Sequence, residues 1–421
     1  MNNISNIPDK KNKKRIVIIG GGFAGLTIAK KLDSKKFQVV LLDKNNNHQF
    51  QPLLYQVAAS GIEPSSISFP FRKIFHKYTD FIFRMCEVTE IERDKKSINT
   101  SIGNIEYDFL IIAMGCDTNY YGNAKLKDTT LALKSTSDAL YMRNCLLENI
   151  ENAINTSDIS LRKQLLSFVI VGGGPTGVEM AGALAEMKKF VLPKDYPELI
   201  MDEISIYLIN GAERVLSTFS PESSMKTEHD LKKMNVNIIN NTFVTNYENS
   251  IVQLSTGTTI ESKNVIWVAG IIANKIAGLS SDSLHKNGRI ITDNYNKVKG
   301  EESIFAIGDI AFIEDSQDNQ QVAQMAIQQA ENLCYNLNND FENQKEFKYH
   351  NKGTMATIGR NDAIAEIGKY KFSGFAAWCI WCMIHLISII GFKNKLFVFI
   401  NWIWSYFTYD QSLRLIIFQK K

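Results

Sequence analysis

Cysteine, histidine and net charge are all scarce in this sequence. Six cysteines and six histidines occur among 421 residues. So few cysteines in so long a chain do not form a disulfide framework, and they indicate a reducing compartment. The histidines lack the spacing of metal ligands, so we expect no metal site. Lys and Arg exceed Asp and Glu by only 47 − 44 = 3, which gives no reason to expect nucleic acid as a partner.

The N-terminus lacks the apolar segment of a secretory signal. The stretch "MNNISNIPDKKNKKRIVIIG" is basic, but nothing apolar precedes the first predicted strand. Asp9 and the absence of arginine enrichment make it a poor transit peptide. We interpret its lysines as a solvated lead-in to that strand. A chain of 421 residues exceeds what one hydrophobic core usually supports, so two or three domains are expected.

Short apolar runs bounded by glycines alternate with helical stretches along the chain. Such runs are typical of buried parallel strands, and the alternation predicts an α/β fold with right-handed crossovers. The β-turn-α pattern starts at 15 and restarts at 168, so we predict two Rossmann-like domains. The predicted strands lie in "RIVIIG" (15–20), "FQVVLLD" (37–43), "YDFLIIAMG" (107–115), "FVIVG" (168–172), "ISIYLIN" (204–210), "NVIWVAG" (264–270) and "SIFAIGD" (303–309). A more polar helical stretch is predicted over about 135–165.

The first unit has the spacing Gly20-x-Gly22-x-x-Gly25 between a strand and a helix. The three glycines suit a tight turn, close approach of a pyrophosphate and close packing of helix on strand. The pyrophosphate would lie at the helix N-terminus, where free N–H groups favour an anion. Asp43, at the end of the next strand, can accept hydrogen bonds from ribose hydroxyls. The alternative is a tight structural turn.

The second unit repeats the spacing as Gly172-x-Gly174-x-x-Gly177, but Asn210 stands at the end of the next strand. An asparagine can bond a 2′-hydroxyl, yet it lacks the charge that repels a 2′-phosphate. NADH is therefore the first choice and NADPH stays open. Asn210 can also be only a turn residue before Gly211. Two adjacent cradles suggest a bound flavin dinucleotide that meets a nicotinamide substrate at their reactive rings.

With these motifs in order, the chain resembles the two-dinucleotide-binding-domain flavoproteins. "IFAIGDIA" (304–311) is similar to their second flavin motif, which directs Asp309 to the ribityl and phosphate region of FAD. "LIIAMG" (110–115) and "VIWVAG" (265–270) are similar to their domain-junction motifs.

A closer resemblance is to the type II NADH dehydrogenases, which are non-pumping NADH:quinone oxidoreductases. "FQPLLYQVA" (50–58) resembles their loop beside the isoalloxazine ring, and "AQMAIQQAEN" (323–332) resembles their quinone-site helix. "MATIGRNDAIAEIG" (355–368) and "GFKNKLFVFINWIWSYFTYDQSLRLI" (391–416) resemble their C-terminal segment. The resemblance spans about 14–416. The departure is Asn210, where an acid is usual.

The resemblance assigns roles to the positions that match. It implies that Glu179 faces the nicotinamide–flavin contact, and that Gln324 and Gln328 lie near the quinone. The residues that it implies for dinucleotide binding are Gly20, Gly22, Phe23, Ala24, Gly25, Asp43, Lys44, Pro52, Leu53, Ala113, Gly115, Gly308, Asp309, Gln324, Met325, Gly172, Gly174, Pro175, Thr176, Gly177, Glu179, Asn210, Ala269 and Gly270.

Each catalytic assignment has a simpler alternative. Glu179 can be a first-turn carboxylate favoured by the helix dipole. Gln324 and Gln328 share a helix face and can be surface residues. Lys371 can donate to quinone, meet lipid headgroups or do neither. The pair Cys379 and Cys382 forms a CxxC, but it lies in an apolar segment far in sequence from the flavin motifs, so we interpret it as packing.

The C-terminal region is unusually apolar. Residues 372–392 carry no charge with His385 neutral, and 21 residues of helix would be about 31 Å long, enough to span a bilayer. Ser373, Ser388 and Gly391 weaken that interpretation. Tryptophans and an excess of basic residues favour helices that lie in the membrane interface. A buried dimer interface is the remaining alternative. The tail charges are Lys393, Lys395, Arg414, Lys420 and Lys421 against Asp410.

We therefore predict an α/β chain with two Rossmann-like domains and a C-terminal α-helical membrane-anchoring segment. We expect a homodimer, peripheral on the cytoplasmic face of the cell membrane, that uses non-covalent FAD to oxidise NADH and reduce a quinone. The alternatives are a soluble flavin disulfide or peroxide reductase and a flavin-based redox sensor. The predicted segments are 14–124 and 263–345 for FAD, 125–262 for NADH, and 346–421 for membrane anchoring and dimerisation.

Overall fold

The computed structural model describes residues 6–408 and 413–417. Contacts group the chain into two compact units. Unit 1 comprises Met1–His48, Phe69–Asp117 and Ile271–Lys352, and unit 2 comprises Gln49–Ser68, Thr118–Gly270 and Gly353–Lys421. The unit boundaries differ from the expected segments, because residues 49–68, 118–124 and 263–270 of the expected FAD segments fall in unit 2. The C-terminal region belongs to unit 2 from residue 353 onward. Three of the tail charges, Asp410, Lys420 and Lys421, lie outside the described residues.

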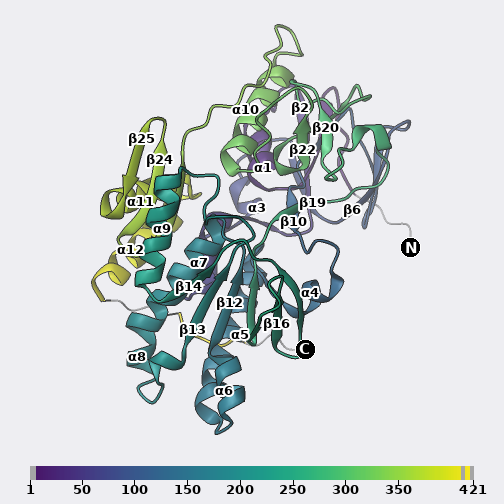
Figure 1. Cartoon of the computed structure of the whole chain (residues 1–421). Helices are drawn as coiled ribbons and strands as arrows, with labels where there is room; N and C mark the ends of the chain where they lie inside the picture. Colours follow the sequence, from purple (N-terminus) through teal and green to yellow (C-terminus); the bar gives the residue numbers. More distant parts are fainter. Residues whose placement is uncertain (1–5, 409–412, 418–421) are drawn as a thin grey trace. The chain divides into compact units, whose positions relative to one another are not determined.

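Unit 1 contains the first glycine motif and the second flavin motif (Figure 1). Its elements are β1 (Lys14–Ile19), α1 (Phe23–Lys31), β2 (Phe37–Asp43), α3 (Phe71–Ile74), β5 (Phe81–Met85), β6 (Val88–Glu92), β7 (Ser97–Thr100), β8 (Gly103–Glu106), β9 (Phe109–Ile112), β19 (Ile271–Ala273), β20 (Ile290–Thr292), β21 (Ile304–Ala306), β22 (Ala311–Ile313) and α10 (Ala323–Asn338). Strands β3 (Asn47–Gln49), β4 (Ser68–Pro70) and β10 (Cys116–Thr118) lie at the chain crossings between units.

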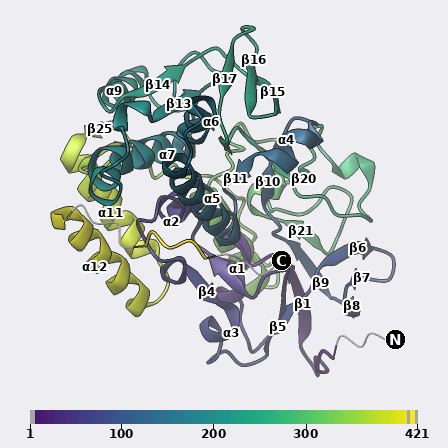
Figure 2. The same cartoon turned by 90° about the horizontal axis from the view of Figure 1, so that it is seen from below.

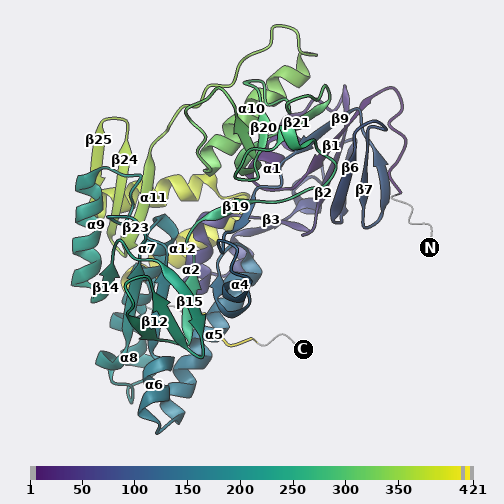
Figure 3. The same ribbon diagram turned by 45° about the vertical axis from the view of Figure 1, so that its right-hand side comes forward.

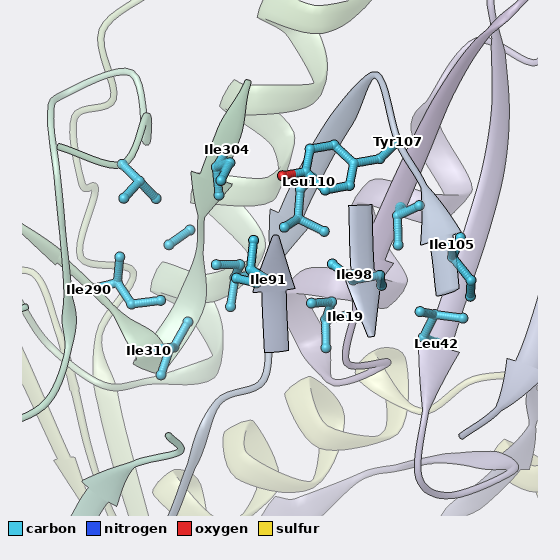
Figure 4. Close-up of a cluster of buried hydrophobic side chains, with 14 of the residues drawn as sticks. Ile19, Leu42, Ile91, Ile98, Ile105, Tyr107, Leu110, Ile290, Ile304 and Ile310 are labelled. Carbon is cyan, nitrogen blue, oxygen red and sulfur yellow. The ribbon is translucent and has the colours of Figure 1, made fainter. Parts of the chain in front are cut away.

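A parallel sheet with the order β21-β9-β1-β2-β5 forms the centre of unit 1. Its central strands are buried because their sequences are continuous apolar runs. On one face, aliphatic side chains of this sheet pack against the antiparallel sheet β6-β7-β8 and the strands after β19 (Figure 4). Helix α1 packs against α10, which brings the two flavin motifs together.

Unit 2 contains the second glycine motif and the C-terminal region. Its elements are α2 (Leu54–Ala58), α4 (Ala124–Thr129), β11 (Leu131–Ala132), α5 (Thr136–Asn155), α6 (Ile159–Leu165), β12 (Ser167–Val171), α7 (Pro175–Glu186), α8 (Leu192–Asp195), β13 (Ser205–Ile209), α9 (Pro221–Lys233), β14 (Val236–Ile239), β15 (Val244–Glu248), β16 (Ile251–Leu254), β17 (Thr259–Glu261), β18 (Asn264–Trp267), β23 (Thr354–Gly359), β24 (Asp362–Ile367), β25 (Tyr370–Ser373), α11 (Gly374–Ser388) and α12 (Phe392–Thr408).

The parallel sheet of unit 2 has the order β11-β18-β12-β13-β14. All of β12 is buried, as its apolar sequence predicts. Each of the expected strands in both units is present, and the predicted helical stretch over 135–165 corresponds to α5 and α6. The α/β class with two Rossmann-like sheets is therefore confirmed.

The C-terminal region contains helices, as expected, but an antiparallel sheet precedes them that we did not anticipate. Strands β23, β24 and β25 pair in order and lie beside α9 and α11 (Figure 3). Residues 372 and 373, expected to begin the long apolar helix, belong instead to the end of β25, and α11 covers only 15 residues. Helix α12 contacts α11 (Figure 2). Among residues 6–408 and 413–417, no helix has the length and apolarity needed to cross a bilayer.

Helix α7 packs closely against β23. A Cβ added at Gly182 would lie 1.8 Å from the carbonyl oxygen of Ile358, well inside van der Waals contact. Glycine at this position therefore fixes how close the helix lies to the C-terminal sheet.

We expect Gly182→Ala to lower the thermal stability of the protein. Helix propensity alone predicts stabilisation by about 1 kcal/mol, whereas the clash with Ile358 predicts destabilisation by about 1–3 kcal/mol. Calorimetric unfolding of the variant gives the sign. An unchanged or higher melting temperature would show that the structure accommodates a methyl group beside the Ile358 carbonyl without strain.

Candidate functional site

The first glycine loop joins β1 to α1 and is shaped by close backbone contacts. Gly20 has φ +97, and a Cβ there would lie 2.5 Å from the carbonyl oxygen of Ala113. A Cβ at Gly25 would lie 1.9 Å from the carbonyl oxygen of Gly20. Gly22, by contrast, has no neighbour within 4 Å. The loop is therefore compact on its inner side and has open space at Gly22 and the exposed end of α1.

The side chains of Asp43 and His48 hold this loop by bonding the backbone of Gly21. Asp43 Oδ2 accepts a hydrogen bond from the Gly21 N–H at 2.7 Å, and burial raises the pKa of its carboxyl. His48 Nδ1 lies 2.9 Å from the Gly21 carbonyl oxygen. Burial lowers the pKa of His48 to about 4, so the ring is neutral and Nδ1–H is the donor. The strand-end acid thus holds the loop at the place where a ribose hydroxyl would reach it.

The second flavin motif is fixed by buried polar contacts. Gly308 has φ +79, and its N–H donates to the buried Gln329 side chain at 2.6 Å. The Cys116 thiol donates to Asp309 Oδ2 at 3.0 Å. These contacts hold Asp309 in unit 1, together with the first loop.

The second glycine loop joins β12 to α7 and has the same construction. Gly172 has φ +120, and a Cβ at Gly177 would lie 1.8 Å from the carbonyl oxygen of Gly172. Gly174 has no neighbour within 4 Å, and it is exposed together with Pro175 and Thr176. The N-terminus of α7, with Pro175 at its first positions, is therefore open to an anion.

Asn210 lies directly beneath this second loop. A Cβ at Gly173 would lie 2.6 Å from Asn210 Oδ1. The Asn210 amide donates to the Ala212 carbonyl at 3.0 Å and accepts from the Ala212 N–H at 3.3 Å. The side chain therefore closes a turn, as the simpler alternative expects, and a contact between Asn210 and a ribose stays a prediction.

A pocket of about 100 Å³ opens within unit 2, between α7, β23 and the C-terminal helices. Its lining combines two carboxyls, one guanidinium and several aromatic rings. The lining residues are Tyr55, Gln56, Ala59, Gly61, Glu179, Ala183, Glu186, Thr357, Gly359, Arg360, Trp378, Trp402, Ser405 and Tyr406.

A continuous chain of hydrogen bonds follows one wall of the pocket. Trp402 Nε1 donates to Gln56 Oε1 at 2.9 Å, and Gln56 Nε2 donates to the Tyr55 hydroxyl at 3.0 Å. That hydroxyl lies 2.8 Å from Thr357 Oγ1, and the Thr357 N–H points to Glu179 Oε1 at 3.4 Å. Residues far apart in sequence thus form one polar wall.

Both carboxyls of the pocket lie on one face of α7, seven residues apart. Burial raises the pKa of Glu179 to about 8 and that of Glu186 to about 7. Glu186 Oε1 also accepts a hydrogen bond from the Arg360 N–H. At neutral pH Glu179 is therefore mostly a neutral acid that can donate a proton, and Glu186 is poised near half ionisation.

Aromatic residues of α11 and α12 cover the pocket region. Trp381 is buried and stacks on His385 with centroids 4.0 Å apart, and burial lowers the pKa of His385 to about 4. Trp378 lies 5.8 Å from Tyr406, and the Arg360 guanidinium lies 5.0 Å from the Tyr406 ring. This apolar cover is the physical cause of the raised carboxyl pKa values.

Several residues implied by the resemblance have structural partners. Gln328 exchanges two hydrogen bonds with the His350 backbone, at 2.9 and 3.0 Å, and Gln324 Oε1 accepts from the Lys352 N–H at 2.9 Å. Met325 is buried against Ile313 and Phe347. Their roles toward quinone and flavin stay predictions.

Other residues singled out in the sequence have the following surroundings. Lys371 forms an ion pair with Glu222 at 2.8 Å. Leu53 is fully buried and Lys44 is exposed. Cys379 and Cys382 are both free thiols in α11.

Sequence analysis missed four residues with clear partners: His48, Cys116, Gln329 and Glu186. For Glu186 a signal was present, since it lies seven residues after Glu179 in an otherwise apolar helix and so shares its face. The other three contact residues distant in sequence, and no local pattern marks them.

The comparisons with known proteins agree with this geometry. Residues 14–330 match the pyridine nucleotide-disulphide oxidoreductase family, and residues 351–408 match the NDH2 C-terminal domain. Two type II NADH:quinone oxidoreductases of Mycobacterium tuberculosis, NdhA and Ndh, are 32% and 34% identical to the chain. The matches cover 93% of this chain in both cases, and 86% and 87% of the relatives.

Solved structures share the fold. NDH2 from Plasmodium falciparum, solved in complex with NADH, superposes with a TM-score of 0.88 at 22% identity, covering 96% of this chain and 100% of that one. The sulfide:quinone oxidoreductase of Aquifex aeolicus has a TM-score of 0.73 at 17% identity, covering 91% and 92%.

Paired glycine cradles on two Rossmann-like sheets define a pyridine nucleotide-linked flavoprotein oxidoreductase. The matching C-terminal domain and the relatives above 30% identity narrow the class, and the chain belongs to the type II NADH:quinone oxidoreductase family. Enzymes of this family are associated with membranes. The open space at Gly22 and the acid below the loop fit a dinucleotide cofactor such as FAD.

We expect Gly22→Ala to weaken FAD binding more than tenfold without destabilising the flavin-free protein. A Cβ at Gly22 meets no protein atom, but it occupies the space that a pyrophosphate needs. Flavin content after purification and titration of the apoprotein with FAD measure the effect.

Gly25→Ala is the contrasting control, because its Cβ meets the Gly20 carbonyl and should lower the melting temperature of the flavin-free protein as well. Normal FAD affinity of Gly22→Ala would exclude this cradle as the pyrophosphate site.

Proposed function

We propose that the chain oxidises NADH and reduces a membrane quinone to quinol, with FAD held by the glycine loop and Asp309 of unit 1. The chemistry that FAD supplies when bound is two-electron transfer from NADH to quinone. NADH binds at the second loop, with its pyrophosphate on the N-terminus of α7 and its ribose beside Asn210. The open backbone at Gly174 and the close support from Asn210 favour this assignment.

We assign the quinone to the pocket of unit 2. Its walls combine flat aromatic side chains with a few polar atoms, as is typical of small-molecule sites. The single observation that carries this assignment is the pair of buried carboxyls, Glu179 and Glu186, in one apolar pocket. Reduction of a quinone by NADH consumes one proton from solution, and such a pair can deliver it.

The pocket residues have separate tasks in this proposal. Glu179 holds a proton on its carboxyl because burial disfavours the anion, and it donates that proton as negative charge develops on a quinone oxygen. Glu186, seven residues further along the same helix face, is a second acid that lines the pocket. Tyr55 and Thr357 orient Glu179 through the polar wall, while Trp378 and Trp402 exclude water.

The alternatives have less support. A flavin disulfide reductase keeps a redox cysteine pair beside the flavin motif, whereas the CxxC of this chain lies in α11 of unit 2. A redox sensor does not need a carboxyl-lined pocket. Gln324 and Gln328 lie in unit 1, so this assignment does not include the quinone contact that the resemblance implies for them.

We expect Glu179→Gln to lower quinone-dependent kcat about 100-fold, because the amide cannot donate a proton as an acid. In the wild type, Glu179 loses its proton as the pH rises through about 8, so the rate should fall above that pH. The variant should lack this limb of the profile. Steady-state NADH oxidation with a soluble quinone analogue from pH 6 to 9 measures both effects.

Glu222→Gln, an exposed glutamate of unit 2, is the matched control and should keep the wild-type profile. A wild-type rate and an unchanged pH profile in Glu179→Gln would remove Glu179 from the reaction.

We further propose that α11 and α12 lie on the lipid surface at the cytoplasmic face, and that the enzyme is a homodimer. The support for the lipid contact is an unusual concentration of exposed apolar side chains on these two helices. They are Phe375, Met383, Ile387, Phe392, Leu396, Phe397, Phe399, Ile400, Ile403, Trp404 and Phe407. Lys393 and Lys395 add the positive charge that anionic lipids attract.

We expect the double variant Trp404→Ser, Phe407→Ser to lose most of its binding to anionic vesicles, because it removes two side chains that are 57% and 75% exposed. Co-sedimentation with phosphatidylglycerol vesicles measures the bound fraction. Tyr121→Ser, which removes a side chain 70% exposed outside these helices, should bind like the wild type. Equal binding of all three proteins would argue for a protein partner on this surface.

A further inference from the structure

The second nucleotide cradle lacks an acid at its strand end. Asn210 is buried and neutral there, beside the loop that receives the ribose. In cradles of this type an Asp or Glu at this position bonds the 2′-hydroxyl and repels a 2′-phosphate. If no other group replaced that charge, the site would have no electrostatic reason to prefer NADH.

A carboxylate is nevertheless connected to Asn210 through one amide. The Asn210 side chain donates to Asn240 Oδ1 at 2.9 Å, and Asn240 Nδ2 donates to Glu228 Oε1 at 2.8 Å. Glu228 lies on α9, and its Oε1 also accepts from the Val215 N–H at 3.3 Å. The chain of contacts therefore runs from α9 to the end of β13 beneath the glycine loop.

The polarity of this chain is fixed by its acid end. A carboxylate only accepts hydrogen bonds, so Asn240 must turn its NH₂ group to Glu228 and its oxygen to Asn210. Asn210 then turns its own NH₂ group away, and the Ala212 backbone fixes the same orientation. Its Oδ1 faces Gly173. An oxygen there can accept from a 2′-hydroxyl but cannot bond a fully ionised 2′-phosphate.

Two basic side chains near this position have partners within the protein. The Arg214 guanidinium donates to the carbonyl oxygens of Ser217 and Phe219 at 3.2 and 3.3 Å. Lys232 lies 3.7 Å from Glu228 Oε2 on the same helix. The negative charge of Glu228 is thus only partly balanced, and its side chain is 19% exposed.

We propose that Glu228, acting through Asn240, is the specificity-determining acid of the nicotinamide nucleotide site, so that this enzyme takes NADH in preference to NADPH. The inference rests on the proposed NADH site at the second cradle. It places the discriminating charge on α9 rather than at the end of β13. Glu228 is a positioning and electrostatic residue that does not itself touch the nucleotide.

The test uses binding of two fragments that cannot react, ADP-ribose and 2′-phospho-ADP-ribose, to the purified flavoprotein. Isothermal titration calorimetry gives both dissociation constants. The wild type should bind ADP-ribose more tightly. Glu228→Gln keeps an acceptor for Asn240 but removes the charge, and it should narrow the preference by about five- to tenfold, the effect expected from one nearby charge at a partly exposed site. Its affinity for ADP-ribose should stay within about twofold, which also verifies folding.

Glu213→Gln is the matched control, since Glu213 lies closer to Asn210 in sequence but is exposed. It should change the preference less than about twofold, because solvent screens an exposed charge. The inference fails if Glu213→Gln changes the preference for ADP-ribose and Glu228→Gln does not. It also fails if neither variant changes the preference while ADP-ribose still binds. In both cases the proposed nucleotide site itself stands. Failure of the wild type to bind ADP-ribose overturns the proposed nucleotide site as well.

Discussion

The close contact between α7 and β23 is the constraint on which the rest of unit 2 depends. Gly182 lets the helix lie against the Ile358 carbonyl, where any side chain would collide. The second glycine loop leads into the N-terminus of α7, Glu179 lies near that end of the helix, and Glu186 is its last residue. One helix therefore connects the glycine loop to the pocket, and Thr357 of β23 and Arg360 after it contact the two glutamates. The glycine at position 182 thus affects the geometry of both the second glycine loop and the pocket of unit 2.

Burial determines the chemistry of the pocket. A carboxyl in water ionises far below neutral pH, but the aromatic cover from α11 and α12 removes water from Glu179 and favours its neutral form. The hydrogen-bond chain from Trp402 to Thr357 then fixes its orientation without supplying a cation that would restore the anion. The same C-terminal helices expose apolar side chains on their outer surface. The inner surface of α11 and α12 thus favours the neutral form of Glu179, and the outer surface is the one that we propose contacts lipid.

Much of this architecture could be predicted from local sequence. Runs such as residues 168–171 are apolar without interruption, and glycine spacings have a fixed meaning in a β-turn-α unit, so both β-turn-α units were predicted correctly. The pocket could not be predicted in that way, because Tyr55, Glu179, Thr357 and Trp402 meet only in the folded chain. The sheet of residues 354–373 was missed because the apolar segment after it dominated the pattern, although Asn361, with φ 62 in the turn between β23 and β24, is a typical hairpin residue. Asn210 shows the same limit, since its partner Asn240 and the acid that Asn240 bonds, Glu228, are distant from it in sequence.

The protonation state of Glu179 is the most direct test of this account. Infrared difference spectroscopy of the purified enzyme, with Glu179→Gln as the reference, would show whether a carboxylic acid band belongs to this residue and how it titrates. The account predicts a protonated carboxyl at pH 7 whose band disappears as the pH rises through about 8. A side chain that is already ionised at pH 6 would contradict it, because the pocket would then hold an anion where the proposed reaction needs an acid.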